Sequence, residues 1–397
     1  MKNMKILICF ALALLLAACT SEDEPVFETT FSDFGYATGD LAIDLTQSDA
    51  GNLRLEWENS VAVNSTLVFY RVLFSGNKDD FSDPVHEIET DRLGTAAYLT
   101  VAPAAMNIIA EKAGVRQNTS GNVYWSVHAS NGISTKTISG EAKKITVTRP
   151  AGFAAFPEKL YLTGAATPGG DDIEQALVLK ASKKKADATQ DSAFFNIVVP
   201  LKQGEFRLVN AKQGRVRSFG FDDNGKIIEI FEGDNLKNEV PADGLYHLGL
   251  NFQTNTADYG KIEQVDLIVV RSGQPEDVVA TLNYTSDYTW KTEFLSRLSN
   301  GSNLPAGAMY KFRFTETAVK GGQTNLAYWG STSETATPPT ADAAESYFYV
   351  TRVNSDTKNY YRFPTSVSGS NSGKAMKAVL VMNPNNDHFY HSNTVAE

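Results

Sequence analysis

Short runs of alternating apolar and polar residues recur along this chain and constrain its fold most strongly. Examples are residues 53–57 (LRLEW), 67–74 (LVFYRVLF), 123–129 (VYWSVHA) and 144–148 (KITVT), which Gly, Asn and Asp separate. A period of two places successive side chains on opposite faces of a β-strand. Aromatic residues, which favour strands, make up 11% of the chain. We therefore predict an all-β protein built from sandwiches.

One helix interrupts the first predicted sandwich. We place it over residues 104–113, where four apolar residues share one helix face: Met106, Ile109, Ala110 and Ala113. The run at 124–129 and the Asn-Gly turn at 131–132 resemble a strand and hairpin of a fibronectin- or immunoglobulin-like domain. Trp57 and Trp125 lie in predicted strands, so we assign them to the core and not to a ligand platform.

Breaks in the strand pattern divide the 397 residues into domains. Pro150 and Gly152 end the first sandwich, which we place at residues 34–150. Behind them three weak matches occur in the same order: 159–164 with 264–270, 193–197 with 288–292, and 201–208 with 304–312. This order suggests two copies of one sandwich, at residues 155–262 and 263–397. If residues 261–271 form the last strand of the middle domain, the boundary moves to about 273.

The N-terminal residues indicate export and lipid attachment. Residues 6–16 form an apolar run of about 16 Å, half of a ~30 Å hydrocarbon core, so residues 1–18 read as a signal peptide and not as a membrane-spanning helix. The Leu-Ala-Ala-Cys sequence at 16–19 resembles a bacterial lipobox, in which Cys19 carries lipid. The alternative is an ordinary cleavage site with a chance cysteine. Residues 19–33 then form an acidic tether, and after loss of Cys9 the exported chain has no disulfide.

Charge and motif content exclude several functions. The net charge is −10, and it becomes −12 without Lys2 and Lys5, which disfavours nucleic acid and anionic polysaccharides as partners. The five histidines are scattered, and no phosphate loop, nucleophile elbow or zinc motif occurs. Asp171-Asp172 and residues 221–225 lack the ligand spacing of a calcium loop. We expect no enzyme activity, no cofactor and no metal.

The order of these parts resembles the SusE/SusF outer-membrane lipoproteins of Bacteroidetes starch-utilisation systems. The sharpest local match is residues 160–170 (LYLTGAATPGG), which resembles the GDATPGGW loop that opens their carbohydrate-binding modules. The chain departs from that loop at Ala165, where the family has Asp, and at Asp171, where it has Trp. A strand position that often carries Trp in the family holds Phe194-Phe195-Asn196 in the middle domain, whereas the third domain keeps Trp290.

The resemblance implies both a fold and a role. The fold would be an immunoglobulin- or fibronectin-III-like sandwich followed by two tandem sandwiches of the carbohydrate-binding-module type. The protein would be anchored by lipid in the outer membrane, facing the cell exterior. It would bind a starch-like or other neutral polysaccharide or oligosaccharide without cutting it. A SusC/SusD-like transporter complex, dependent on TonB, would be its partner in uptake.

The third predicted domain offers the best material for a glycan site. Such a site needs exposed aromatic planes beside side chains that hydrogen-bond hydroxyls. Trp290 and Tyr288 share one probable strand with Tyr284, and Tyr328 and Trp329 lie in a probable loop. Lys311 and Arg313 alternate with aromatics and project opposite to them. The predicted carbohydrate-binding residues are Trp290, Trp329, Tyr328, Tyr288, Lys311 and Arg313.

Plainer alternatives remain for these residues and for the protein. Trp290 lies in a strand whose aromatics would also suit a core, and Lys311 and Arg313 would suit the solvated side of a strand. The chain could also be an adhesion or assembly protein, which would show a broad exposed apolar patch or an unpaired edge strand. A degenerate surface hydrolase would need a pair of carboxylates in a cleft.

Overall fold

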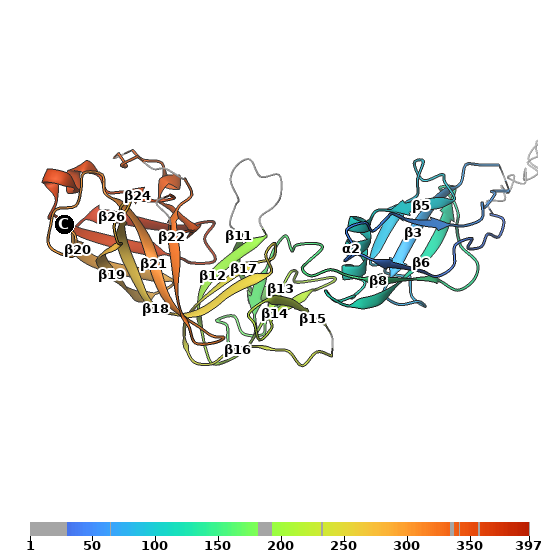
Figure 1. Ribbon diagram of the computed structural model, residues 1–397, viewed down its shortest axis with the longest axis horizontal. Coiled ribbons are helices and arrows are strands. Elements are labelled where there is room, and N and C mark those ends of the chain that lie inside the picture. The colour runs from blue at the N-terminus through green and yellow to red at the C-terminus, as the bar shows by residue number, and fades with distance from the viewer. Residues whose placement is uncertain are drawn as a thin grey trace, which may run out of the picture. The chain divides into compact units, whose positions relative to one another are not determined.

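The computed structural model describes residues 30–63, 65–181, 193–231, 233–333, 337–340, 342–355 and 358–396. The leader, Cys19 and most of the predicted tether lie outside these residues. Strands make up 47% of the chain and helices 7%, so the all-β prediction is confirmed at this level. Contacts group the chain into two compact units, residues 1–154 and 155–397 (Figure 1). The break at Pro150 and Gly152 lies just before the division between them.

Unit 1 consists of a mixed sheet, a two-stranded ribbon and one helix. The sheet has the order β1-β8-β6-β3-β4, in which β1 is parallel to β8, and β7 pairs with β6; β2 pairs with β5. The element bounds are β1 Leu41–Asp44, β2 Leu53–Glu56, β3 Phe69–Ser75, β4 His86–Glu89, β5 Tyr98–Val101, α2 Pro103–Lys112, β6 Ser120–Ser130, β7 Thr135–Thr137 and β8 Lys143–Thr148.

The core of unit 1 joins the sheet, the ribbon and the helix. Trp57 and Trp125 are 4% and 0% exposed, which confirms their assignment to the core. The predicted helix is confirmed as α2, which buries Met106, Ile109 and Ala110. It begins with proline at its first position and is followed by Gly114 at a φ of 88°, as expected for a helix start and stop.

The first part of unit 2 has two sheets around a core of its own. One sheet has the order β10-β9-β13-β14-β15, with β16 paired to β13, and the other contains β11-β12-β17-β18. The bounds are β9 Tyr161–Thr163, η1 Ile173–Gln175, β10 Leu177–Val178, β11 Lys180–Ala181, β12 Phe194–Leu201, β13 Gly204–Val209, β14 Ser218–Phe221, β15 Ile227–Ile230, β16 Asn238–Val240, β17 Gly244–Asn251 and β18 Thr256–Val270.

The second part of unit 2 is a sheet that closes on itself. Its order is β18-β19-β20-β25-β26-β23-β22-β21, and β21 pairs back to β18, so we call these eight antiparallel strands the closed sheet. β24 also pairs with β21. The bounds are β19 Asp277–Ser286, β20 Thr289–Leu295, β21 Met309–Ala318, β22 Thr324–Ser331, η2 Glu345–Phe348, β23 Tyr349–Val353, β24 Tyr361–Arg362, η3 Thr365–Val367, η4 Gly369–Asn371, β25 Ala375–Val381 and β26 Phe389–Val395.

A single strand, β18, belongs to both parts of unit 2 (Figure 1). On one edge, the first half of β18 pairs with β17 and the second half pairs with β19. On the other edge, β18 pairs with β21 from Gly260 to Val270. The predicted boundary between residues 262 and 263 therefore falls inside one 15-residue strand. The three segment matches fall on β9 and the second half of β18, on β12 and β20, and on β13 and β21. The strand order β9-β13-β14-β15 of the first part parallels β18-β21-β22-β23 of the second, and β12-β17-β18 parallels β20-β25-β26.

His391 lies inside the closed sheet among aromatic side chains. It is 1% exposed, its Nδ1 donates to the carbonyl of Phe348 at 3.0 Å, and its Nε2 accepts from the hydroxyl of Tyr310 at 3.0 Å. Burial lowers the pKa of His391 to about 3, although the hydrogen bond to Phe348 works in the opposite direction. The imidazole is therefore held neutral in the folded protein.

We predict that His391 remains neutral at pH 5, with its proton on Nδ1. An unfolded histidine takes up a proton near pH 6.5. The free energy of unfolding should therefore fall as the pH drops from 6.5 toward 3, by roughly 2 kcal/mol at pH 5 for this one group. Nitrogen-15 NMR of the imidazole resonances checks the protonation state. Two protonated ring nitrogens on His391 at pH 5 would contradict the prediction.

The loop that carries the family resemblance folds tightly against β13. The N–H of Gly164 donates to the carbonyl of Gly170 at 2.8 Å, and the N–H of Ala166 donates to Glu205 at 2.9 Å. Gly164 has a φ of 123°, and a Cβ there would lie 2.6 Å from the Cα of Phe206. The glycine is thus required both by its backbone angle and by the close approach of β13.

We predict that Gly164→Ala lowers the free energy of unfolding by roughly 2 kcal/mol or more, because the backbone of β13 must move to admit the methyl group. Gly170→Ala is the matched control, because Gly170 also has a positive φ, 63°, but no atom lies within 4 Å of the added carbon. The control should lose only about 1 kcal/mol. Urea-induced unfolding measures both, and equal losses would refute the packing argument.

Candidate functional site

Two of the predicted glycan-binding residues, Trp290 and Trp329, lie in the interior of the closed sheet. They are 2% and 1% exposed and belong to its hydrophobic core. Trp329 contacts Phe314 at 5.7 Å and Phe389 at 6.0 Å between ring centroids. A ring enclosed in this way has no face left for a sugar. Their placement is a correction to the sequence-based expectation, since alternation turns both indoles inward.

Lys311 and Arg313 on β21 and Tyr328 on β22 lie on the face of the closed sheet opposite to that of Trp329. Lys311 is buried and donates to the carbonyl of Asn354 at 2.8 Å. Arg313 forms ion pairs with Asp266 at 2.7 Å and Glu276 at 3.0 Å. Burial acts to lower the pKa of Arg313, but the two carboxylates outweigh it and the pKa is raised. Tyr328 is 9% exposed, and burial raises its pKa.

Tyr288 does not lie on a strand with Trp290. It occupies the two-residue turn between β19 and β20 together with Asp287, and both have positive φ angles, 56° and 48°. A two-residue turn with a positive φ at both positions matches the twist of the strands that it joins, although such turns are usually built from Asn, Asp or Gly. Tyr284 instead pairs with Trp290 in register. The six predicted residues therefore lie on two faces and a turn, and they do not form one site.

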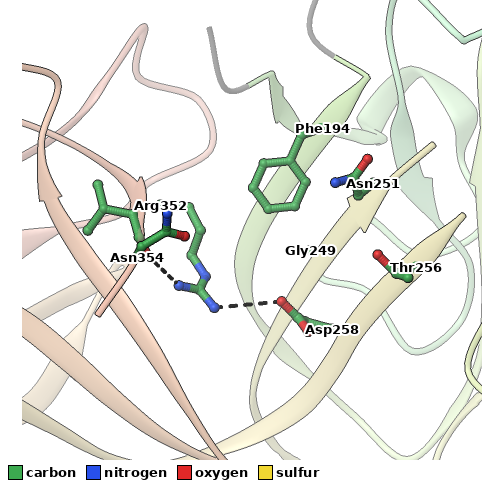
Figure 2. A pocket seen from close by; sticks show the side chains of 8 residues that line it. Phe194, Gly249, Asn251, Thr256, Asp258, Arg352 and Asn354 are labelled. Carbon is green, nitrogen blue, oxygen red and sulfur yellow. Dashed lines mark hydrogen bonds and ion pairs between the residues drawn. The ribbon is translucent and has the colours of Figure 1, made fainter. Parts of the chain in front are cut away.

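The structure offers a different candidate in unit 2, a polar pocket of about 280 Å³. It lies between β23 on one side and β12, β17 and β18 on the other (Figure 2). We call it the polar pocket. Its lining residues are Phe194, Gly249, Asn251, Thr256, Asp258, Arg352, Val353 and Asn354.

Strand register explains why these side chains meet. Phe194 pairs with Asn251 and Asn251 pairs with Thr256, so one face of β12, β17 and β18 carries all three. Arg352 pairs with Trp329, which points into the closed sheet, so Arg352 points the same way at the end of β23. The polar pocket therefore continues the interior of the closed sheet where its apolar lining ends.

A guanidinium and a carboxylate face each other across the polar pocket. Nη2 of Arg352 lies 3.6 Å from Oδ2 of Asp258, and Figure 2 shows the arginine reaching across to it. Nη1 of Arg352 donates to the carbonyls of Val353 at 2.8 Å and Tyr328 at 3.2 Å, which fixes the side chain. The pair leaves the lining with no net formal charge. The pair also places carboxylate oxygens and guanidinium N–H groups beside the space that a ligand would occupy.

The other walls supply an aromatic ring and neutral hydrogen-bonding groups. Figure 2 shows the ring of Phe194 facing the space between Arg352 and Asn251. Asn251 provides an amide and Thr256 a hydroxyl on the same face. A flat apolar ring beside donors and acceptors suits a ligand that has C–H faces and hydroxyl groups.

A buried polar triad lies behind the polar pocket. His247 is 0% exposed; its Nδ1 lies 2.9 Å from Oε1 of Glu316, and its Nε2 lies 3.1 Å from Oδ1 of Asn196. Two glycines make room for these contacts. A Cβ at Gly260 would lie 3.1 Å from that of Glu316, and a Cβ at Gly249 would lie 3.1 Å from the Asn196 oxygen. The triad thus fixes β12, β17 and β21 relative to one another beneath Gly249.

The acidic turns considered for calcium serve local backbone contacts. Oδ1 of Asp222 accepts from the N–H groups of Asn224 and Lys226 at 2.9 and 2.8 Å. Oδ1 of Asp172 accepts from the N–H of Glu174 at the start of η1. Within the described residues no group of three or more His, Cys, Asp or Glu side chains could hold a metal ion.

Comparison with known proteins gives no assignment. No family model matches this chain, and no curated protein matches it in sequence. Across the residues that the structure describes, no helix combines the length and the apolar character needed to cross a membrane.

Sequence analysis missed the polar pocket, although a signal was present. Residues 246, 248, 250 and 252 are all apolar, whereas the alternate positions hold His247, Gly249 and Asn251. A hairpin from 244 to 261 sets this second face against Asp258 and Thr256. In the sequence, Phe194 and Asn196 stand out only because they occupy a position that often carries tryptophan in the SusE/SusF proteins that the chain resembles. No sequence signal marks Arg352, because this residue reaches the polar pocket only when the sheet that contains β23 closes on itself.

We predict strong coupling between His247 and Glu316. His247→Phe and Glu316→Leu should each lower the free energy of unfolding by about 3 kcal/mol or more, because each leaves a buried polar partner behind. The double variant should lose less than the sum, with a coupling of about 1–3 kcal/mol. Urea unfolding followed by tryptophan fluorescence measures all four proteins. Additive losses would show that the two side chains act independently.

Proposed function

We propose that this protein is a non-catalytic cell-surface lipoprotein that binds a neutral polysaccharide or oligosaccharide and holds it for uptake. The observation that carries the proposal is the composition of the polar pocket. Phe194 provides an apolar plane, and Asn251, Thr256, Asp258 and Arg352 surround it with hydrogen-bonding groups. Sugars present both an apolar ring face and a rim of hydroxyls, which these groups would bind together.

The charge and the volume of the polar pocket restrict the class of ligand that it could bind. Asp258 and Arg352 balance one another, so the lining favours a neutral sugar over a charged one. The volume of about 280 Å³ lies just below the ~300–1,000 Å³ of pockets that enclose drug-sized ligands. The polar pocket would therefore hold a short part of a glycan and not a long stretch of chain. Weak single sites of this kind gain strength when many are gathered on one surface.

The same lining supports binding without cleavage. Hydrolysis of a glycosidic bond generally uses two carboxylates about 5–9.5 Å apart on either side of the bond. Among the described residues that line the polar pocket, Asp258 is the only carboxylate, and it pairs with Arg352. Holding the glycan would then be this protein's task, and cutting it would fall to another protein.

The proposed location rests on the N-terminal sequence. The Leu-Ala-Ala-Cys sequence would direct lipid to Cys19, and the acidic tether would place the folded units on the outer face of the outer membrane. The resemblance to SusE/SusF proteins would make a SusC/SusD-like transporter the partner. Under this proposal unit 1 is the immunoglobulin-like domain, and unit 2 corresponds to the two carbohydrate-binding-module-like domains.

We predict that residues 20–397 are retarded by one class of neutral polysaccharide in affinity gel electrophoresis. Phe194→Ala should weaken binding by about tenfold or more, because the sugar loses its apolar plane. Arg352→Met, which keeps the length of the side chain, should weaken it as well, because donors to the sugar hydroxyls are lost.

Two controls separate the polar pocket from the earlier candidates. Phe156→Ala removes another partly exposed phenylalanine of unit 2 and should leave binding unchanged. Trp290→Phe keeps an aromatic ring in the core and should also bind normally. Binding that survives Phe194→Ala and Arg352→Met but is lost in Trp290→Phe, with folding intact, would overturn the assignment. No retardation by any glycan would favour a protein partner.

A further inference from the structure

The most exposed apolar side chains of the described protein gather in unit 1. Leu93 is 92% exposed and Ile133 is 78% exposed, and neither packs into the core. Exposed apolar side chains that cluster, in contrast to single ones, mark a contact with a membrane or another protein. We call this cluster the apolar tip, and its members are Val61, Val63, Leu67, Phe69, Leu93 and Ile133.

Backbone and side-chain contacts bring the members of the apolar tip together. Phe69, the first residue of β3, pairs with Ser130, the last residue of β6. The amide of Asn131 then donates to the hydroxyl of Thr66 at 3.2 Å, which ties the turn that carries Ile133 to the segment that carries Leu67. The N–H of Tyr70 donates to the carbonyl of Gly94 at 2.6 Å, and a Cβ on Gly94 would lie 3.4 Å from the Phe69 ring, so the turn that carries Leu93 lies against the start of β3.

The chain enters unit 1 at this same tip. The N–H of Val63 donates to the carbonyl of Thr30 at 3.0 Å, and the N–H of Val61 donates to the hydroxyl of Ser32 at 2.8 Å. Cys19 lies eleven positions before Thr30. At about 3.3–3.6 Å per residue, that length of chain spans at most about 40 Å. A lipid on Cys19 therefore keeps the apolar tip within this distance of the bilayer.

We propose that the apolar tip inserts into the surface of the lipid bilayer that holds Cys19. This inference rests on the lipid anchor of the proposed function. A lipid anchor confines the protein to the membrane, and apolar loop residues then gain by leaving water at the headgroup boundary. The nearby basic side chain of Lys136 is already paired with Asp33, so insertion relies on apolar contact and should be insensitive to salt.

Insertion would give unit 1 a fixed orientation. β3 begins at the apolar tip with Phe69 and ends at Ser75, so its far end points away from the bilayer. The exposed turn that follows it, with Asp79, would remain in water. The first unit would then act as an upright support on the membrane and not as a freely tumbling spacer.

Chemical coupling provides the test. A chain of residues 19–397 keeps one thiol, Cys19, which can be joined to a maleimide lipid in phosphatidylcholine vesicles. The four native tryptophans are at most 4% exposed, so a Leu93→Trp substitution adds a distinct exposed probe. Its fluorescence should be strongly quenched when the vesicles contain brominated acyl chains, and 0.5 M salt should not restore it. Ile133→Asp combined with Leu67→Asp should relieve the quenching.

Asp79→Trp is the matched control, at the opposite end of β3, and should not be quenched. Equal quenching of both probes, or none at Leu93→Trp although the protein floats with the vesicles, would overturn the proposal. So would a dimer of the uncoupled chain that Leu93→Asp dissociates, because the apolar tip would then be a contact between two copies. Coupling replaces natural lipidation, and mass spectrometry of the exported protein tests Cys19 separately. Failure here would leave the glycan proposal standing.

Discussion

The pairing of β18 with β21 holds the two parts of unit 2 together. Residues Gly260 to Val270 of β18 pair with β21, while the other edge of β18 changes partner from β17 to β19. One strand therefore closes the closed sheet and also completes the neighbouring sheet. A register shift between Ile262 and Gln264 keeps Ile262 and Val265 on the same face, so a continuous interior passes from one part to the other.

The polar pocket depends on this shared strand. Phe194 and Asn251 come from the sheet that β18 completes, whereas Arg352 comes from the sheet that β18 closes. Asp258 stands on β18 itself and meets Arg352. Beneath them His247 and Glu316 join strands of both parts through the space left by Gly260. The binding groups are thus positioned by the main chain and by a buried hydrogen-bonded pair, which suits a site that must be preorganised.

Local patterns predicted the elements of this protein better than their assembly. Alternation gave the strands, Met106 and Ile109 gave the helix, and the core positions of Trp57 and Trp125 followed from their strands. The boundary at residues 262 and 263 follows from the start of the second repeated segment, and it falls inside β18 because this one strand serves both parts. Closure of a sheet pairs strands far apart in the chain, and no local pattern marks those partners. Arg352 could not be assigned for this reason.

The same argument explains why prominent aromatics were a poor guide to the site. In a closed sheet, a large aromatic residue on an inward position is needed to fill the interior, as Trp290, Trp329 and Phe312 do. The side chains that bind a ligand then come from positions where the inward face is no longer lined by apolar residues. In this protein that change occurs next to the closed sheet, on β17 of the neighbouring sheet, where Gly249 and Asn251 stand beside Phe194 in place of bulky residues. A transition from apolar to polar along one strand face is therefore a better marker of a binding site here than an aromatic residue alone.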